Sequence, residues 1–491
     1  MDKQKLHKEN TFSISSDELK SKLDNQIPLM LFDIRDAKSF GQRHIPRSAY
    51  AVCNEESKKN IMPLLPKDIE IVLVGEGEEY PKQISEMMRQ FGLDAKYLEG
   101  GISSWKWQFN ESSDKDISPK ELKTLLDSPK DKDNIFLLDV REPDEFRQWN
   151  IDGSINIPLG NLFQEQSLAR LPKDKRVVTI CPQGNRATVG KYILERYGYN
   201  ASSLSGGLKA WSTSFEYAYS VVDIDGSKIR LVQFRRIGKG CMSYLLDSEG
   251  ESVVIDPVYP IDDYLQKASE IGTKISRVVE THQHADHISS AKELAKKTGA
   301  IYYQSRYENY INEGIEKRMQ IRDADIIDVG RIKIKTIHTP GHTLGSLSFL
   351  VNGRNGDNNS ELLFTGDTLF VNGIGRPDLR DRSKEFATML YDTLHNKLFS
   401  LCENSIVFPA HFDKDEKAEK IISSTLGEIR KKSDLIKLKK DDFVNKVSST
   451  VMPMPPSYKE IIAINTGKKT VPTVNEIYDL EIGPNRCSIS M

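Results

Sequence analysis

Histidine and aspartate side chains occur in four separate stretches of the sequence, each directly after a run of apolar residues. The densest stretch is 281–287, Thr-His-Gln-His-Ala-Asp-His; the others are Thr-Pro-Gly-His at 339–342, Thr-Gly-Asp at 365–367 and Pro-Ala-His at 409–411. Imidazole and carboxylate groups are suitable ligands for zinc, iron or manganese. The sequence therefore predicts a metal site, whose candidate ligands are His282, His284, Asp286, His287, His342, Asp367 and His411.

The runs before these stretches have the length and the apolar or alternating pattern of β-strands. The expected strands are 275–280, 332–337, 361–364 and 405–408. Loops at one edge of a sheet would bring the seven side chains together, which is a common way for a scaffold to present a site. A single histidine is more often a core or surface residue, but four stretches of this kind favour a metal site. No function is assigned to the histidines without such a context, which are His7, His44, His338 and His395.

A cysteine and an arginine lie in the loop Cys-Pro-Gln-Gly-Asn-Arg at 181–186, between an expected strand at 176–180 and an expected helix at 187–197. Backbone N–H groups in such a loop and the N-terminus of the helix favour an anion, so we expect a lowered pKa for the Cys181 thiol. A thiolate there can attack a sulfane sulfur and hold it as a persulfide. Arg186 adds positive charge that suits an anionic donor such as thiosulfate or a persulfide. No function is assigned to the other cysteines, Cys53, Cys241, Cys402 and Cys487.

This loop belongs to the second copy of an internal repeat. Four landmarks recur at a constant offset of 106 positions: Asp33-Ile-Arg as Asp139-Val-Arg, Ile45 as Ile151, Gly100-Gly as Gly206-Gly, and Trp105 as Trp211. In both copies apolar runs alternate with amphipathic stretches, which predicts a parallel α/β sheet. Gly75 and Tyr80 of the first copy stand where the second copy has its cysteine and arginine. We therefore predict that the first copy is catalytically inactive and has a structural or docking role.

The composition restricts the classes of partner. The chain has 491 residues, of which 38% are hydrophobic and 29% charged, and its formal net charge is -2. This length predicts several domains, and the charge balance argues against a nucleic-acid partner. No apolar run is long enough to span a bilayer, the first ten residues are polar, and the five dispersed cysteines form no C-x-x-C pair. We therefore expect no membrane partner, no disulfide framework and a cytoplasmic location.

The second copy resembles the rhodanese family of sulfurtransferases. The matching segments are Leu-Asp-Val-Arg-Glu at 138–142, Ile-Asn-Ile-Pro at 155–158, C-x-x-G-x-R at 181–186 and Gly-Gly-Leu-Lys-Ala-Trp at 206–211. One departure is Asn150, where the family often has histidine. The resemblance implies that Cys181 is catalytic and carries a persulfide, that Arg186 binds the substrate, and that thiosulfate or sulfite is a small-molecule partner.

Residues 223–434 resemble the metallo-β-lactamase superfamily, whose fold is an αββα sandwich with a mono- or dinuclear metal site. Within it, His-Gln-His-Ala-Asp-His at 282–287 and Gly-Ile-Gly-Arg-Pro-Asp at 373–378 are similar to the persulfide dioxygenases. That resemblance implies one Fe(II) per chain, bound by His282, His342 and Asp367, with positions left open for O2 and a persulfide. It also implies that Arg376 binds the carboxylate of the thiol substrate. The residues that would orient ligands and water are His284, Asp286, His287 and His411.

The same seven residues also fit a dinuclear site. In a zinc thioesterase of the glyoxalase II type, two Zn(II) per chain would be bound, and a bridging hydroxide would attack a thioester. Four residues would then become direct ligands: His284, Asp286, His287 and His411. The rhodanese copies would serve as sulfur carriers or docking domains. Residues 435–491 show no helical substrate domain of the kind that glyoxalase II enzymes carry, and 472–482 has an extended pattern.

The expected fold class is multidomain, α/β and α+β. We expect a catalytically inactive rhodanese-like parallel-sheet domain at 11–112 and an active one at 113–222. A metallo-β-lactamase αββα sandwich should follow at 223–434, with a C-terminal extension at 435–491 packed on it. The expected activity is O2-dependent oxidation of a low-molecular-weight thiol persulfide to sulfite plus thiol, coupled to sulfur transfer through Cys181. The sequence does not identify the thiol and leaves open whether the chain forms a homo-oligomer.

Overall fold

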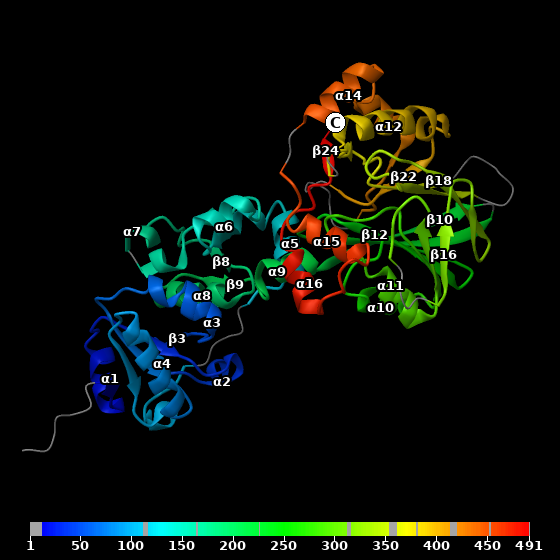
Figure 1. The fold of residues 1–491 in the computed structure, drawn as a ribbon. Coiled ribbons are helices and arrows are strands. Elements are labelled where there is room, and N and C mark those ends of the chain that lie inside the picture. The colour runs from blue at the N-terminus through cyan, green and yellow to red at the C-terminus, as the bar shows by residue number, and fades with distance from the viewer. Residues whose placement is uncertain are drawn as a thin grey trace, which may run out of the picture. The chain divides into compact units, whose positions relative to one another are not determined.

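The computed structural model describes residues 12–110, 116–163, 165–224, 226–311, 316–352, 361–379, 382–412, 420–450 and 453–490. The chain forms two units, Met1–Ala210 and Trp211–Met491 (Figure 1). The expected boundary between the two repeat copies, at 112/113, lies outside the described residues. Among the helices that the structure describes, none has the length and apolar content needed to cross a bilayer.

In the first unit, each copy of the repeat forms a parallel sheet. The sheet of the first copy has the strand order β1-β5-β4-β2-β3. Its strands are β1 (Ser13–Ile14), β2 (Leu29–Asp33), β3 (Ala49–Tyr50), β4 (Glu70–Val74) and β5 (Ala95–Leu98). Its helices are α1 (Ser16–Asp24), α2 (Ala37–Gln42), α3 (Glu55–Asn60) and α4 (Glu79–Gln90).

The sheet of the second copy has the order β7-β6-β8-β9 and is also parallel. Its strands are β6 (Ile135–Asp139), β7 (Ile155–Asn156), β8 (Arg176–Ile180) and β9 (Ala201–Ser203). The helices that follow the first copy are α5 (Pro119–Asp127), α6 (Pro143–Gln148), α7 (Glu165–Leu168), α8 (Asn185–Arg196) and α9 (Gly207–Thr213). The strand predicted at 176–180 is β8, and the helix predicted at 187–197 is α8, which confirms the strand-loop-helix order around the cysteine.

The recurring Asp-x-Arg motif makes the same contacts in both copies. Arg141 donates hydrogen bonds to Asp139 and to the carbonyl oxygen of Trp149 (2.6 Å). Arg35 donates to Asp33 and to the carbonyl oxygen of Arg43, which stands 106 positions before Trp149. The repeat offset therefore holds for three-dimensional contacts as well as for sequence. Both arginines are buried, so the motif stabilises the loop after the strand.

The second unit contains two larger sheets, with the orders β10-β11-β12-β13-β14-β15-β16 and β17-β18-β19-β20-β22-β23. The strands of the first are β10 (Phe215–Ile224), β11 (Ser227–Arg236), β12 (Met242–Ser248), β13 (Glu251–Ile255), β14 (Lys274–Val279), β15 (Ile301–Ser305) and β16 (Arg318–Ile321). Those of the second are β17 (Ile326–Val329), β18 (Ile332–His338), β19 (Leu347–Asn352), β20 (Leu362–Gly366), β22 (Ile406–Pro409) and β23 (Ser424–Thr425). Strand β10 runs across the expected domain boundary at 222/223. It pairs along its whole length with β11, so it is part of the seven-stranded sheet.

The two sheets pack face to face around an aromatic and aliphatic core. Tyr244 of β12 contacts Phe364 of β20 and Phe408 of β22, with ring centroids 5.0 and 5.8 Å apart. On the outer faces lie helices, which bury the remaining apolar side chains of both sheets. The seven-stranded sheet is covered by α10 (Asp262–Glu270) and α11 (Ala291–Thr298), and the six-stranded sheet by α12 (Ser383–Asn396), α13 (Leu426–Lys432) and α14 (Lys440–Ser449). This arrangement is the expected αββα sandwich.

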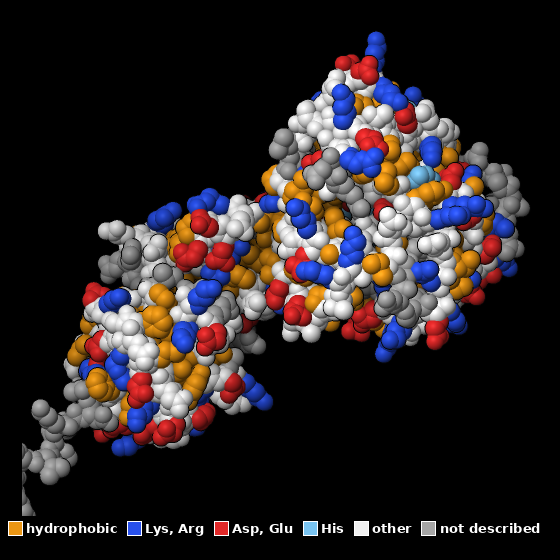
Figure 2. Space-filling model, viewed as in Figure 1, with side chains coloured by type: hydrophobic (Ala, Val, Ile, Leu, Met, Phe, Trp, Pro, Cys, Tyr) orange, Lys and Arg blue, Asp and Glu red, His pale blue; other side chains and the backbone are white. Residues whose placement is uncertain are grey.

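The C-terminal segment packs on the same unit. It forms α15 (Tyr458–Asn465), α16 (Val474–Leu480) and β24 (Ser488–Ser490), which pairs antiparallel with β21 (Gly373–Gly375). The extended pattern expected for 472–482 is wrong, because Thr473 and Glu476 form a capping box that starts a helix. On the face shown in Figure 2, basic and acidic side chains are interspersed over both units.

Candidate metal centre and cysteine loop

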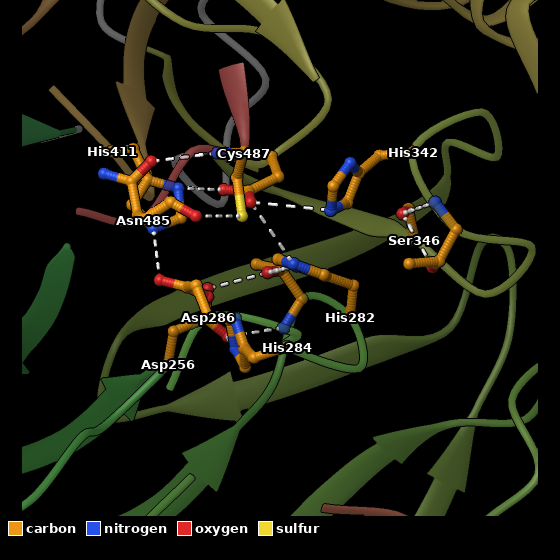
Figure 3. Close-up of polar contacts among 12 residues, drawn as sticks. Asp256, His282, His284, Asp286, His342, Ser346, His411, Asn485 and Cys487 are labelled. Atoms are coloured by element: carbon orange, nitrogen blue, oxygen red, sulfur yellow. Dashed lines mark hydrogen bonds and ion pairs between the residues drawn. The ribbon is translucent and has the colours of Figure 1, made fainter. Parts of the chain in front are cut away.

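The candidate metal ligands follow strand ends at one edge of the sandwich. The strands predicted before them correspond to β14, β18, β20 and β22, each within two residues of its expected limits. Three of the seven candidates form a compact group: one ligand atom from each of His282, His342 and Asp367 lies within 4.8 Å of the other two. Figure 3 shows His282 and His342 of this group beside His411 and Asp286. The sequence pattern therefore brings residues from three distant stretches to a common centre.

The facing atoms of this group lack other partners. Nε2 of His282 and Nε2 of His342 each lie 3.5 Å from Oδ2 of Asp367. All three side chains are 1% exposed, and in the described part of the chain none of these three atoms has a hydrogen-bond partner. A buried polar atom without a partner costs free energy. The group thus offers two imidazole nitrogens and one carboxylate oxygen, a donor set that suits Fe(II) or zinc.

Neighbouring groups orient both rings. Nδ1 of His342 donates to the carbonyl oxygen of Arg376 (2.8 Å), and Nδ1 of His282 lies 2.9 Å from Oγ1 of Thr281. Because that hydroxyl donates to Asp256 (2.7 Å), it accepts from the imidazole. Burial lowers the pKa of His342 to about 4, so its ring is neutral near pH 7. Both rings therefore present an Nε2 lone pair to the centre, as a metal ligand must.

A second group lies beside the first and includes a cysteine to which the sequence assigns no function. Cys241, Asp286, His287 and His411 also place one ligand atom each within 4.8 Å of one another. Oδ2 of Asp286 accepts from the Cys241 thiol (2.9 Å) and lies 3.0 Å from Nε2 of His411. Nδ1 of His411 is 2.6 Å from Oδ1 of Asp367, so His411 links the two groups. These four side chains have the ligand types for a second ion.

A further cysteine, Cys487, forms a third set with Asp367 and His411. It is fully buried, and burial raises the pKa of its thiol well above the usual value. The pairing of β24 with β21 brings Cys487 to the site, and an isolated β-bridge to His411 brings Cys241. No pattern in the sequence signals either contact, because each cysteine stands alone between ordinary residues.

His284 is directed at Asp256, outside the first group. Its Nε2 lies 3.2 Å from Oδ1 of Asp256. Although burial disfavours the charged ring, the Asp256 carboxylate raises the pKa of His284 to about 9. Asp256 also accepts from the backbone N–H of Thr281 (2.7 Å). This aspartate, which the sequence did not distinguish from other acidic residues, therefore fixes the start of the ligand loop.

Arg376, expected to bind the substrate carboxylate, has other partners. Its side chain is fully buried, and each of its five N–H groups has an acceptor. Two are oxygens of Asp378 (2.6 and 2.7 Å), two are the carbonyl oxygens of Pro453 (2.8 Å) and Arg486 (3.0 Å), and one is Sδ of Met454 (3.5 Å). The guanidinium stabilises the position of the C-terminal segment through these contacts. It does not face an open site. We therefore do not assign Arg376 to the substrate; its contribution is the carbonyl oxygen that orients a histidine.

Cys181 lies under the loop between β8 and α8. Its Sγ accepts hydrogen bonds from the backbone N–H groups of Gly184 (3.1 Å) and Ala187 (3.3 Å), so the expected cradle of N–H donors is present. The thiol is only 1% exposed, however. Burial raises the pKa of Cys181, although the Ala187 N–H and the Arg186 charge act in the opposite direction. The expected lowering of this pKa is wrong for this structure, because loss of hydration outweighs the hydrogen bonds.

The Gly-Gly landmark of each copy is explained by this loop. Gly207 has a φ of 61°, and a Cβ added there would lie 2.3 Å from the carbonyl oxygen of Cys181. In the first copy Gly101 has a φ of 59°, and its Cβ would lie 2.7 Å from the carbonyl oxygen of Gly75. Only glycine fits so close to the loop backbone.

The first copy keeps this loop geometry without the reactive groups. Gly75 carries no thiol, and the hydroxyl of Tyr80 donates to the carbonyl oxygen of Cys53 (2.9 Å). Glu76 pairs with Arg35 (3.2 Å). The lack of catalytic activity in this copy stays a prediction, and the geometry agrees with it.

Arg186 forms a two-point ion pair instead of facing solvent as a free cation. Its Nη1 and Nη2 each lie 2.8 Å from a carboxylate oxygen of Glu145 in α6. Although burial disfavours the carboxylate, the Arg186 guanidinium lowers the pKa of Glu145. The positive charge expected to attract an anionic donor is therefore largely neutralised.

Glu145→Gln is expected to lower the KM for thiosulfate in sulfur transfer by about five-fold. The substitution removes the carboxylate that pairs with Arg186, and one partly exposed charge contact contributes about 1 kcal/mol. Steady-state rates over a thiosulfate series would measure the effect. The control is Asp144→Asn on the same helix, whose carboxylate pairs with the exposed Arg147. An unchanged KM in Glu145→Gln would exclude Arg186 from donor binding.

Comparison with known proteins agrees with this architecture. The sequence matches the Metallo-beta-lactamase superfamily over residues 236–411 and the Rhodanese-like domain over 15–108 and 118–214. The persulfide dioxygenase ETHE1, mitochondrial, of Homo sapiens is 32% identical over 236 residues, which cover 47% of this chain and 85% of that protein. A hydroxyacylglutathione hydrolase of Dictyostelium discoideum is 32% identical over 179 residues, which cover 36% of this chain and 63% of that protein.

A crystal structure of ETHE1 from Myxococcus xanthus is 28% identical, with a TM-score of 0.41, and the match covers 48% of this chain and 97% of that one. The identity of this chain to the human relative, and the share of that relative that the match covers, show the family of this chain. The chain therefore belongs to the metallo-beta-lactamase superfamily, in its persulfide dioxygenase-like branch, and carries two rhodanese-like domains before that domain.

Proposed function

We propose that the chain oxidises a low-molecular-weight thiol persulfide with O2 at a mononuclear iron site formed by His282, His342 and Asp367. The observation that carries the proposal is the set of three buried, unpartnered donor atoms at one centre, while His284 is engaged by Asp256. The overall reaction is RSSH + O2 + H2O → RSH + SO3²⁻ + 2 H⁺. The Fe(II) would supply adjacent open coordination positions at which O2 and the persulfide sulfur can meet.

The chain's own residues orient the ligands and exclude water. Thr281 and the carbonyl oxygen of Arg376 hold the two rings. His411 contacts both Asp367 and Asp286, so it is placed to hold a proton between the two carboxylates. Beside it lies a pocket of about 10 Å³, bordered by Phe370, His411 and Ser488. This volume suits about one water molecule.

We also propose that Cys181 transfers sulfane sulfur. Its thiolate would attack the outer sulfur of thiosulfate, the S–S bond of thiosulfate would break, and sulfite would leave with the electron pair of that bond. The resulting Cys181 persulfide would then pass its outer sulfur to a thiol and return to the thiolate. Sulfite is a product of the metal domain and the partner of this step, so one metabolite connects the two activities. The cytoplasmic location stays a prediction, since the human relative is named mitochondrial.

The test is oxygen uptake after anaerobic loading with Fe(II), using glutathione persulfide and coenzyme A persulfide as substrates. We expect uptake with at least one of them, release of sulfite, and one iron per chain by elemental analysis. The second group of possible ligands, around Asp286 and Cys241, could hold a second ion. The alternative to the dioxygenase is therefore a dinuclear zinc hydrolase. Two zincs per chain, thioester hydrolysis and no uptake with any persulfide would reject the dioxygenase.

A further inference from the structure

The side chain of Asn465, the last residue of α15, contacts the ligand loop at three points. Its Nδ2 donates to the carbonyl oxygens of His284 (2.9 Å) and His287 (2.8 Å). Its Oδ1 accepts from the backbone N–H of Ser289 (2.9 Å). The side chain is 9% exposed. One amide therefore satisfies three backbone groups in the segment 284–289.

The loop depends on such contacts because it has no regular secondary structure. Strand β14 ends at Val279 and helix α11 begins at Ala291, so the segment between them has only isolated backbone contacts, such as the bridge between Ser289 and Val258. A second contact comes from Glu481, whose Oε1 accepts from the N–H of Ile288 (2.5 Å) and whose other oxygen pairs with the buried Arg236. These two contacts come from the C-terminal segment, whereas Asp256 holds the start of the loop through the N–H of Thr281.

We propose that Asn465 is a positioning residue of the metal centre, which fixes the ligand loop through both ends of its amide. The proposal rests on the metal site proposed above. An amide is the group that fits, because it carries two N–H donors at one end and an acceptor at the other. A carboxylate would face two carbonyl oxygens without a proton, and a hydroxyl group is too short to reach three backbone groups.

This role predicts an effect on metal binding beyond an effect on folding. The loop carries His282 at its start and Asp286 and His287 between the contacts of Asn465. A shift of its backbone moves these side chains relative to Asp367 and His342, which lie on other loops. Groups hydrogen-bonded to metal ligands typically contribute 10–100-fold to metal affinity, and Asn465 acts on the same ligands through the backbone of their loop.

The test compares Asn465→Ser and Asn465→Asp with the wild-type chain. We expect the affinity for Fe(II) and for Co(II), measured anaerobically by competition with a chelator, to fall about 10–100-fold in both variants. The visible absorption of bound Co(II) should also change, because it reports the arrangement of the ligands. If Asn465→Asp does not fold, the uncharged Asn465→Ser variant carries the test. Cooperative unfolding of the metal-free variant, followed by circular dichroism, shows that the fold is intact.

The matched control is Asn156→Ser. Nδ2 of Asn156 also donates to two backbone carbonyl oxygens, those of Asp139 (3.0 Å) and Arg141 (2.8 Å), but in the second rhodanese copy. This control should leave metal affinity within about two-fold. Unchanged affinity and an unchanged Co(II) spectrum in Asn465→Ser would overturn the inference and leave the proposed function standing. Tight metal binding without persulfide oxidation by the wild type would overturn the proposed function alone.

Discussion

The substitution His342→Ala is expected to abolish oxygen consumption with a persulfide, by about a thousand-fold or more, and to prevent retention of iron. Nε2 of His342 is one of three unpartnered donor atoms that converge on one centre, and its ring is already fixed by the carbonyl oxygen of Arg376. Removal leaves one imidazole and one carboxylate, which bind Fe(II) weakly. A metal ion contributes several kcal/mol to such a reaction, and each 1.36 kcal/mol is a factor of ten in rate.

The matched control for this variant is His338→Ala, four positions earlier in the same sequence region. His338 stacks on Tyr307 and its Nε2 contacts the carbonyl oxygen of Leu344, so its ring is partly packed but lies in none of the three ligand groups. Oxygen uptake and iron content should stay within about two-fold of the wild type. Iron retention and full activity in His342→Ala would show that the metal binds elsewhere, for example in the group around Asp286 and Cys241.

The part of the site that the sequence predicts is the part that follows strand ends. His282, His342 and Asp367 lie directly after strands whose apolar patterns are visible. Strands β18, β20 and β22 run in the same direction, because β18 and β20 are each antiparallel to β19 and β20 is parallel to β22, so their C-terminal ends lie at one edge of the sheet. The internal repeat also fixes which loop of the first copy corresponds to the cysteine loop, and the Asp-Arg contacts in both copies show that this correspondence holds in space.

The residues that the sequence missed reach the site through contacts that no local pattern records. A single β-bridge brings Cys241 to the site, and the pairing of β21 with β24 brings Cys487. Asn465 lies at the end of a helix, about 180 positions after the loop that it supports. Asp256 is one of 71 acidic residues, and only its contacts with Thr281 and His284 distinguish it. Such side chains are selected by packing of distant segments, which a single sequence does not specify.

The errors in charge assignment have a different cause. An arginine in the sequence shows that a positive charge is present but does not show which carboxylate it pairs with. Arg186 pairs with Glu145, and Arg376 with Asp378 and the C-terminal backbone, so neither presents a free cation. The pKa of Cys181 differs from the prediction for a related reason: the sequence predicts the N–H donors of the loop but not the depth at which the thiol is buried.

The rhodanese half of the proposal leads to the prediction that Cys181→Ser loses thiosulfate-to-thiol sulfur transfer by at least about a thousand-fold, because the nucleophile itself is removed. A serine hydroxyl has nearly the same size and can accept the Gly184 and Ala187 N–H groups, so the loop should remain folded. It cannot hold a sulfane sulfur. Mass spectrometry of wild-type protein after thiosulfate treatment should show the gain of one sulfur atom on Cys181, and the variant should show none.

The control, Cys53→Ser, removes a partly buried thiol in the first unit, where burial raises its pKa to about 12. It should keep full sulfur transfer, because no loop N–H donors are directed at that sulfur within the described residues. Oxygen uptake with a persulfide should be unchanged in both variants, since the proposed iron ligands all come from the other unit. If Cys181→Ser retains sulfur transfer, the second copy acts as a docking module in the same way as the first, and only the metal domain is catalytic. Loss of transfer with oxygen uptake intact requires two separate chemical centres in one chain.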